Sequence, residues 1–356
     1  SDVCSSDLIK KPFSAGKELA DYIQSDPKLN QLPLILTHQS AGPPVSLYLN
    51  KDLYYPEQSS FGSFLLSNFG PTLCERYFFP YNRKIWNRDL FSIPLSWLHG
   101  KLPMARPDEI LISNILASEE KDMVHSTFYY PVHGGSQFIA DRLSEGVDIT
   151  HEQVESIAKR EGYFYINGDK QAFDLVVSTI DARLLPSILS GDELASIREL
   201  IIEEEVAKSL DSNGTSNLLC ECDANDYSWV YLPESATSFH RIIMTGNFSP
   251  HNNSESLQDG RTTCTVEASG FHTRERLEAE LRFLPFNLKP IAYNHCPNSY
   301  IIHTKDTDKS IQRIKDLSQQ NGIYLCGRFA EWKYFNMDAA IESALSTCSQ
   351  LIESLA

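Results

Sequence analysis

The sequence predicts an α/β fold in which a parallel sheet is accompanied by a separate antiparallel sheet. The apolar, β-branched run at residues 173–180 precedes a helical pattern at 182–189, and the apolar run at 322–327 precedes a helix at 338–355. Buried strands that feed helices are typical of parallel sheets covered by helices on both faces. Between these segments, residues 229–303 contain several short strands without intervening helices, which indicates the antiparallel sheet.

Length and composition are those of an ordinary globular protein. The 356 residues are enough for two or three domains of about 100–200 residues each. Hydrophobic residues make up 42% and charged residues 22%, which favours neither disorder nor fibrous structure. No apolar run reaches the roughly 18–20 residues of a membrane-spanning helix, and the first thirty or so residues carry too many charges for a signal peptide. We therefore expect a soluble cytoplasmic protein with no membrane span.

Net charge and cysteine and histidine spacing exclude several function classes. The 47 acidic and 31 basic residues give a net charge of −16, which argues against a nucleic-acid surface. A few local arginines can still bind an anionic small molecule. The histidines form no His-x-x-x-His pattern, and Cys220 and Cys222 lack the spacing of a zinc site. We therefore predict reduced thiols and no metal.

The chain is predicted to divide into five segments. Ser1–Leu8 shows no amphipathic pattern and resembles the conceptual translation of a sequencing-adapter oligonucleotide; a native tail is the alternative, and neither reading gives it chemistry. The other segments are a hairpin and mainly helical substrate or cap region (9–130), a part of the parallel-sheet domain (131–190), an antiparallel sheet domain (191–308) and the C-terminal part of the parallel-sheet domain (309–356).

Three local patterns occur in the first half of the chain. Residues 45–55 alternate between apolar and polar side chains, as a hairpin would. Apolar side chains then recur at three- and four-residue steps from Phe61 to Tyr77, which predicts a helix interrupted at Gly70-Pro71. Further along, two glycines and a serine before residue 137 predict the start of a helix over 137–143.

The run Gly327–Asp338, with sequence Gly-Arg-Phe-Ala-Glu-Trp-Lys-Tyr-Phe-Asn-Met-Asp, is the strongest candidate for a binding site. It lies between the strand at 322–327 and the final helix. In open α/β sheets ligands bind at the carboxyl ends of strands, and a helix start favours an anion or developing negative charge. The alternatives are that Trp332 and Tyr334 are core aromatics and that Arg328 forms a surface salt bridge.

The pattern Gly-Arg-x-x-x-Trp-Lys-Tyr-x-Asn-Met-Asp resembles the C-terminal flavin-binding signature of UDP-galactopyranose mutases. The likeness extends in the same order over roughly residues 45–356, at the segments 79–86, 131–135, 174–179, 239–242 and 247–250. The Gly-Gly and Val-Val-Ser-Thr pieces are shared with protoporphyrinogen and amine oxidases. The resemblance implies a flavoprotein with FAD as cofactor, and an incomplete FAD-binding Rossmann-like domain with a helical insertion.

One departure from this family concerns the glycine-rich loop. A flavin domain of this type should open with a strand, Gly-x-Gly-x-x-Gly and a helix, so that backbone amides approach the pyrophosphate. The sequence contains no Gly-x-Gly. We therefore expect that the N-terminal βαβ unit is missing, and that this fragment binds FAD poorly and is inactive alone. A catalytically inactive binding module is the alternative.

The resemblance also implies a function and its residues. The mutases interconvert the ring forms of a nucleotide sugar for cell-surface polysaccharides, through a bond between flavin N5 and the anomeric carbon. Arg241 and Tyr334 would be catalytic, and a homodimer is compatible with the family. The flavin would be contacted by Gly327, Arg328, Trp332, Asn336, Met337 and Asp338. The substrate would be held by Tyr81, Lys84, Trp86, Arg241, Tyr293 and Tyr334, although Tyr81 and Trp86 could equally pack between domains.

A second departure concerns the substrate. A second arginine is expected in an Ile-Pro-Val-Arg-like stretch, which here reads Ile93-Pro-Leu-Ser96, and Asn294 replaces the second tyrosine of a Tyr-Tyr pair. These changes leave open the alternative of a flavin-dependent oxidoreductase of the amine oxidase or protoporphyrinogen oxidase type, which takes a hydride from its substrate.

Overall fold

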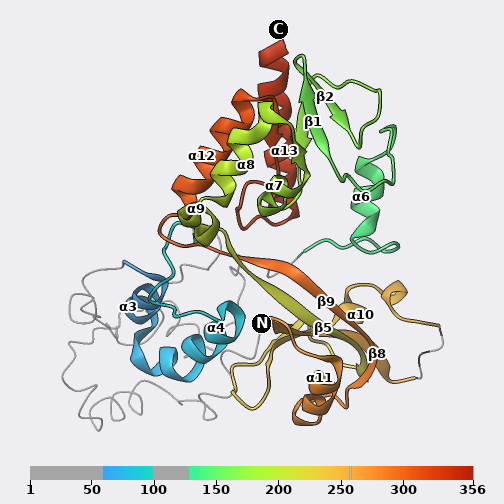
Figure 1. Ribbon diagram of the computed structural model, residues 1–356. Helices are drawn as coiled ribbons and strands as arrows, with labels where there is room; N and C mark the ends of the chain where they lie inside the picture. Colours follow the sequence, from blue (N-terminus) through green and yellow to red (C-terminus); the bar gives the residue numbers. More distant parts are fainter. Residues whose placement is uncertain (1–58, 99–127, 256, 258, 356) are drawn as a thin grey trace, which may run out of the picture. The chain divides into compact units, whose positions relative to one another are not determined.

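A computed structural model describes residues 59–98, 128–255, 257 and 259–355 (Figure 1). The predicted tail Ser1–Leu8 and the predicted hairpin at 45–55 lie outside these residues. The chain divides into two compact units. Unit 1 comprises the described residues up to 140 and those from 216 to 295, and unit 2 comprises residues 141–215 and 296–355.

The helical part of unit 1 begins with α3 (Phe61–Leu73). A capping box starts this helix, because the Ser60 hydroxyl accepts from the Ser63 amide and the Ser63 hydroxyl accepts from the Ser60 amide, at 3.3 and 3.0 Å. Gly70, with φ +73 and ψ 167, kinks the helix directly before Pro71. The predicted interruption is therefore confirmed. A π-helical turn, η2 (Cys74–Phe78), and α4 (Phe79–Trp86) follow.

A five-stranded sheet, in the order β6-β7-β8-β5-β9, lies mostly in unit 1; the strand ends at residues 211–215 and 296–302 belong to unit 2. The neighbours β6, β7 and β8 pair antiparallel, which confirms the predicted antiparallel sheet. The sequence did not reveal β5, because its first half, Asp-Ser-Asn-Gly-Thr-Ser-Asn, has the composition of a turn. The strands are β5 (Asp211–Asp223), β6 (Trp229–Tyr231), β7 (Phe239–Ile243), β8 (Arg261–Ser269) and β9 (Lys289–Ile302).

Among the described residues, four short helical segments lie between these strands, whereas the sequence predicted none there. Helix α10 (Thr245–Phe248) and the 3-10 turn η5 (Pro250–Asn252) follow β7, and α11 (Arg274–Glu280) with η6 (Leu281–Phe283) follows β8. Leu277 and Leu281 pack into the buried cluster formed by β5, β7 and β8. Helix α4 contacts β7 and β8, so it positions its side chains next to these two strands.

The parallel sheet of unit 2 is formed by β3 (Val176–Ser178) and β10 (Ile323–Leu325), in the register Ile323↔Val176 and Leu325↔Ser178. This pairing confirms the predicted parallel arrangement of two segments that are far apart in sequence. The prediction that the sheet is covered on both faces is confirmed only in part, because Val176 packs on the core whereas the side chain of Val177 is 47% exposed. A second sheet joins β1 (Ile157–Arg160), β2 (Tyr163–Ile166) and β4 (Leu189–Ser190).

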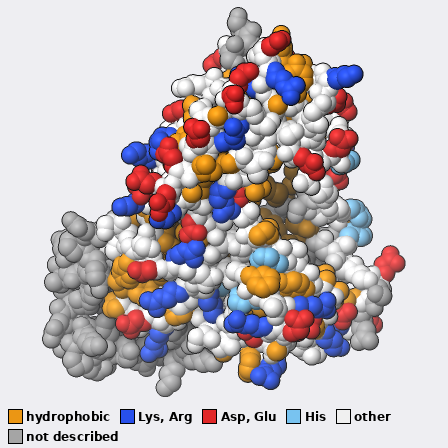
Figure 2. All heavy atoms as spheres, in the orientation of Figure 1, with side chains coloured by type: hydrophobic (Ala, Val, Ile, Leu, Met, Phe, Trp, Pro, Cys, Tyr) orange, Lys and Arg blue, Asp and Glu red, His pale blue; other side chains and the backbone are white. Residues whose placement is uncertain are grey.

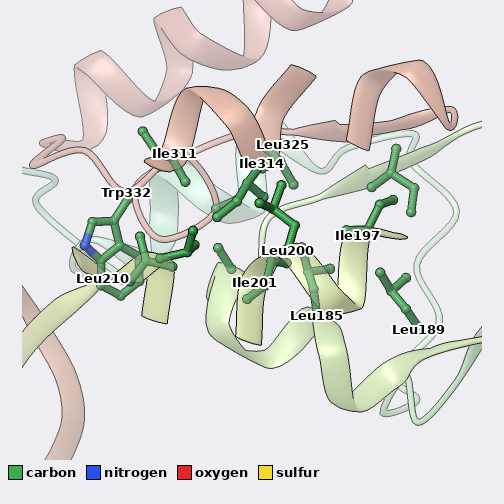
Figure 3. Close-up of a cluster of buried hydrophobic side chains, with 14 of the residues drawn as sticks. Leu185, Leu189, Ile197, Leu200, Ile201, Leu210, Ile311, Ile314, Leu325 and Trp332 are labelled. Atoms are coloured by element: carbon green, nitrogen blue, oxygen red, sulfur yellow. The ribbon is translucent and has the colours of Figure 1, made fainter. Parts of the chain in front are cut away.

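The core of unit 2 lies between helices and β10 (Figure 3). Ile314 of α12 lies near Leu325 and Leu200 of α8, and Ile311 of α12 lies nearer to Trp332. The helices are η3 (Ala182–Leu184), α7 (Leu185–Ile188), η4 (Asp192–Leu194), α8 (Ala195–Ile202), α9 (Glu204–Ser209), α12 (Thr307–Gln320) and α13 (Met337–Leu355). Helix α6 (Gln137–Leu143) has the predicted bounds.

The surface of unit 2 carries many charged side chains on its helices (Figure 2). On the face shown in Figure 2, acidic and basic side chains are interspersed over α8 and α12. None of the helices in the described part of the chain is both long and apolar enough to cross a membrane.

Candidate functional site

The loop Gly327–Asp338 follows β10 in unit 2, and the buried Glu331 carboxylate fixes its path. Gly327 has φ +88, a conformation that favours glycine, and its amide donates to Glu331 Oε2 at 2.9 Å. The same carboxylate accepts from the Ser343 hydroxyl on α13 and from Lys315 Nζ on α12, the latter at 3.1 Å. Glu331 therefore connects the loop to two helices.

These contacts keep Glu331 ionised. Burial by itself would raise the pKa of this carboxyl group, but hydrogen bonds from Ser343, Lys315 and the Gly327 amide outweigh burial and lower the pKa below its usual value. The charged form is therefore the one that holds the loop.

Arg328 contacts the backbone and the aromatic residues of its own unit. Its Nη1 and Nη2 donate to the carbonyls of Phe335 and Ser299, at 3.0 and 2.5 Å. The guanidinium lies 4.2 Å from the ring centroid of Tyr334, which in turn stacks on Tyr300 with the centroids 6.1 Å apart. Arg328 thus supports the turn of the loop and the position of Tyr334.

Trp332 belongs to the core rather than to the surface of the loop. It is fully buried among the apolar side chains of unit 2 (Figure 3), and the Arg183 guanidinium lies 4.7 Å from its ring centroid. Its φ of +49 is the left-handed backbone that turns the ring into the core. For Trp332, the structure matches the alternative of a core aromatic.

The start of α13 is an exposed part of the loop, as is Lys333. The helix begins at Met337, and Asn336 O accepts from the Ala340 amide at 3.0 Å. Asn336, Met337 and Asp338 are all exposed. The first amides of a helix have no partner within it and carry partial positive charge. Of the predicted flavin contacts, these three residues are the exposed ones.

In unit 1, α4 brings Lys84 to the start of β7. Lys84 Nζ donates to the carbonyls of Leu232 and Phe239, both at 2.8 Å. Burial lowers the pKa of Lys84 to about 8, although Glu234 and Glu280 oppose this shift. An ammonium group has three donors, so two carbonyl contacts leave one further N–H on this side chain.

Next to Lys84, three residues form what we call the Glu267 cluster: His240, Arg241 and Glu267. Glu267 Oε1 accepts from His240 Nε2 at 2.9 Å and from Arg241 Nε and Nη2 at 2.9 and 2.8 Å. His240 is fully buried, and this burial lowers its pKa more than Glu267 raises it. Near neutral pH the cluster therefore consists of a neutral imidazole, a guanidinium and a carboxylate.

Tyr81 lies beside this cluster, with its ring centroid 5.3 Å from that of Tyr231 and 6.3 Å from that of His240. Tyr81, Lys84 and Arg241 are thus brought together around β7. The signal in the sequence that led to them was their resemblance to the family segments. His240 and Glu267 were not among the predicted site residues.

The other two predicted substrate residues of unit 1 make structural contacts. Trp86 is buried, its Nε1 donates to Asn82 Oδ1 at 3.3 Å, and its ring packs on Trp97 with the centroids 4.8 Å apart. The Tyr293 hydroxyl donates to the His272 carbonyl at 2.7 Å. In the described residues no group of three or more His, Cys, Asp or Glu side chains is arranged to hold a metal ion.

Comparison with known proteins identifies the fold. Neither a protein-family model nor a curated protein sequence matches the chain. Among solved structures, reduced UDP-galactopyranose mutase is similar over 79% of this chain, with a TM-score of 0.65 and 18% identity. A putative protoporphyrinogen oxidase from Exiguobacterium sp. 255-15 matches over 88% with a TM-score of 0.52 and 13% identity, and cyclohexylamine oxidase from Brevibacterium oxydans over 83% with a TM-score of 0.53 and 8% identity.

These structural similarities confirm the predicted α/β fold class. At such low sequence identities they show the fold alone. The matched region spans 65% of the mutase chain, 69% of the protoporphyrinogen oxidase chain and 68% of the cyclohexylamine oxidase chain.

Proposed function

We propose that this chain is part of a cytoplasmic, flavin-dependent enzyme that acts on a nucleotide sugar as UDP-galactopyranose mutase does. The observation that carries this proposal is the placement of two cations, Lys84 and Arg241, at the start of β7, in a protein whose net charge is −16. A diphosphate needs such a local pair of cations, and the planar guanidinium suits two phosphate oxygens at once.

On the substrate side, we infer that Arg241 and Lys84 bind the diphosphate and that Tyr81 packs beside the nucleotide or sugar. The Arg241 side chain is 29% exposed, so an anion can reach it. Trp86 and Tyr293 would support this site through packing, since their polar atoms contact Asn82 and His272. The role of Tyr334 as a second catalytic residue stays a prediction.

On the cofactor side, the start of α13 fits a flavin better than the rest of the loop does. Asn336, Met337 and Asp338 are exposed there, whereas Arg328 and Trp332 would act by shaping the loop. The partial positive charge of the helix start favours the negative charge of a reduced isoalloxazine ring. When bound, a reduced flavin would supply the nucleophile that displaces UDP from the sugar.

The proposal is tested by titrating the 356-residue chain with UDP in a calorimeter. We expect saturable binding, and Arg241→Gln should weaken it about tenfold or more, because a charge-assisted contact contributes roughly 1.5–3 kcal/mol. Arg274→Gln, on α11, removes an arginine with a side chain 47% exposed and should leave the affinity unchanged. A chain that releases no heat with UDP contradicts the proposal.

A flavin-dependent oxidoreductase is the second candidate. It is favoured by Ser96, which is exposed where the mutases carry an arginine, and by the fold likeness to two oxidases. An enzyme that takes a hydride from an amine or a porphyrin has no need to bind a uridine diphosphate. Absence of UDP binding would therefore favour this candidate over the mutase.

A further inference from the structure

We propose that Glu267 is a positioning residue that aims the Arg241 guanidinium at the anionic substrate, and that a β-bulge at His240 makes this possible. This inference rests on the proposed function, because it takes Arg241 as the cation that binds the diphosphate. It concerns how that cation is oriented.

The bulge is visible in the pairing of β7 with β8. Phe239 pairs with Ala268 and Arg241 pairs with Glu267, so β7 advances by two residues while β8 advances by one. His240 is the extra residue. In a regular strand His240 and Arg241 would point to opposite faces, and a bulge changes the direction of side chains locally. Here both His240 Nε2 and Arg241 Nε reach the same oxygen, Glu267 Oε1, at 2.9 Å.

Lys84 stabilises the same irregularity. A bulge interrupts the hydrogen-bond ladder, and the backbone groups beside it need other partners. Lys84 Nζ donates to the Phe239 carbonyl, directly before the bulged residue, and to the Leu232 carbonyl. The bulge is therefore fixed from two sides, by an ammonium group at its backbone and by a carboxylate at its side chains.

The geometry at Glu267 fixes the plane of the guanidinium. Arg241 uses its Nε and Nη2 for the carboxylate, at 2.9 and 2.8 Å, which is one edge of the group. A guanidinium carries five N–H donors in a rigid fork, so its end edge, with Nη1, is directed away from Glu267. The carboxylate is the less exposed partner, with 11% of its side chain exposed against 29% for Arg241.

Two roles for Glu267 predict opposite signs. A carboxylate in contact with Arg241 offsets part of its positive charge, so if Glu267 were only a counter-charge, neutralising it would strengthen the binding of a phosphate. If Glu267 orients the guanidinium, neutralising it weakens binding, because the side chain must then lose rotational freedom when the anion arrives.

The test is a titration of the 356-residue chain with UDP. We expect Glu267→Gln, which keeps the shape of the side chain, to raise the dissociation constant about fivefold or more. Glu275→Gln removes an equal charge from an exposed position on α11 and should change it by less than about twofold. In an Arg241→Gln background, Glu267→Gln should add no further loss, because Glu267 acts through Arg241.

Equal or tighter binding by Glu267→Gln overturns the inference, and so does an equal loss in the Arg241→Gln background. Near-UV circular dichroism checks that each variant is folded. Should Glu267→Gln fail to fold, Glu267→Asp keeps the charge but shortens the reach, and unchanged UDP affinity in that variant overturns the inference as well. Failure of the unsubstituted chain to bind UDP overturns the proposed function itself, and the inference with it.

Discussion

Two buried carboxylates, one in each unit, show how the same side chain serves different ends. Glu331 in unit 2 accepts from a backbone amide, a serine hydroxyl and Lys315, so it fixes the path of a loop. Glu267 in unit 1 accepts from the side chains of His240 and Arg241, so it fixes the direction of a cation. Substitutions in the loop of unit 2 should therefore mainly change stability, and those in the Glu267 cluster should mainly change ligand affinity.

The largest effect is expected for Trp332→Ala in the loop of unit 2. Trp332 is fully buried in the core, and removing a buried tryptophan side chain costs about 3–5 kcal/mol. The measurement is denaturant unfolding, in which the unfolding of unit 2 is monitored through hydrogen exchange of the backbone amides of α12 and α13. Lys333→Ala, at the exposed neighbouring residue, should stay within about 0.5 kcal/mol. A loss of stability below about 1 kcal/mol for Trp332→Ala would contradict a core position for Trp332 and the conclusion that the loop of unit 2 mainly serves stability.

The next effect is expected for Glu331→Gln. An amide cannot accept from Gly327, Ser343 and Lys315 with the strength of a carboxylate, and an imperfectly satisfied buried group costs about 1–3 kcal/mol. The pKa of Glu331 is lowered in the folded state, so its contribution is present at neutral pH and is lost as the pH falls through the folded pKa. The difference between wild type and variant should therefore shrink in acid. Glu342→Gln, exposed on α13, is the matched control, and a difference that is constant with pH would contradict the role of the charge.

Several elements of the fold could be predicted because their signals are local. Gly70-Pro71 predicts the kink in α3, and the apolar run before residue 180 predicts a strand that precedes a helix. The first half of β5 could not be predicted, because it is polar and becomes a strand only through its neighbours in the sheet.

The candidate site was predictable only as far as its residue pattern reaches. The segment Gly327–Asp338 could be recognised as a candidate binding loop. Its residue pattern does not reveal that Glu331 fixes the path of the loop or that the Trp332 side chain is buried in the core. The Glu267 cluster depends on the register between β7 and β8, which are separated by the helical residues of α10 and η5. A bulge is a property of two paired strands, and no single strand reveals it.

The smallest effect is expected at Lys84, where two observables should move in opposite directions with pH. Its folded pKa is lowered to about 8 from the ordinary value of 10.5. Between these pH values the unfolded chain therefore binds more protons, and the stability contributed by this group rises with pH. Compared with Lys84→Met, the wild type should gain stability over this window, whereas Lys289→Met, at an exposed lysine of unit 1, should show no such trend.

UDP affinity should fall over the same window by up to about fivefold, because a neutral amine no longer attracts phosphate and a partly exposed charge pair contributes about 0.2–1 kcal/mol. Affinity that is constant from pH 7 to about 9.5 would assign Lys84 to the bulge alone and leave Arg241 as the cation that binds the anion.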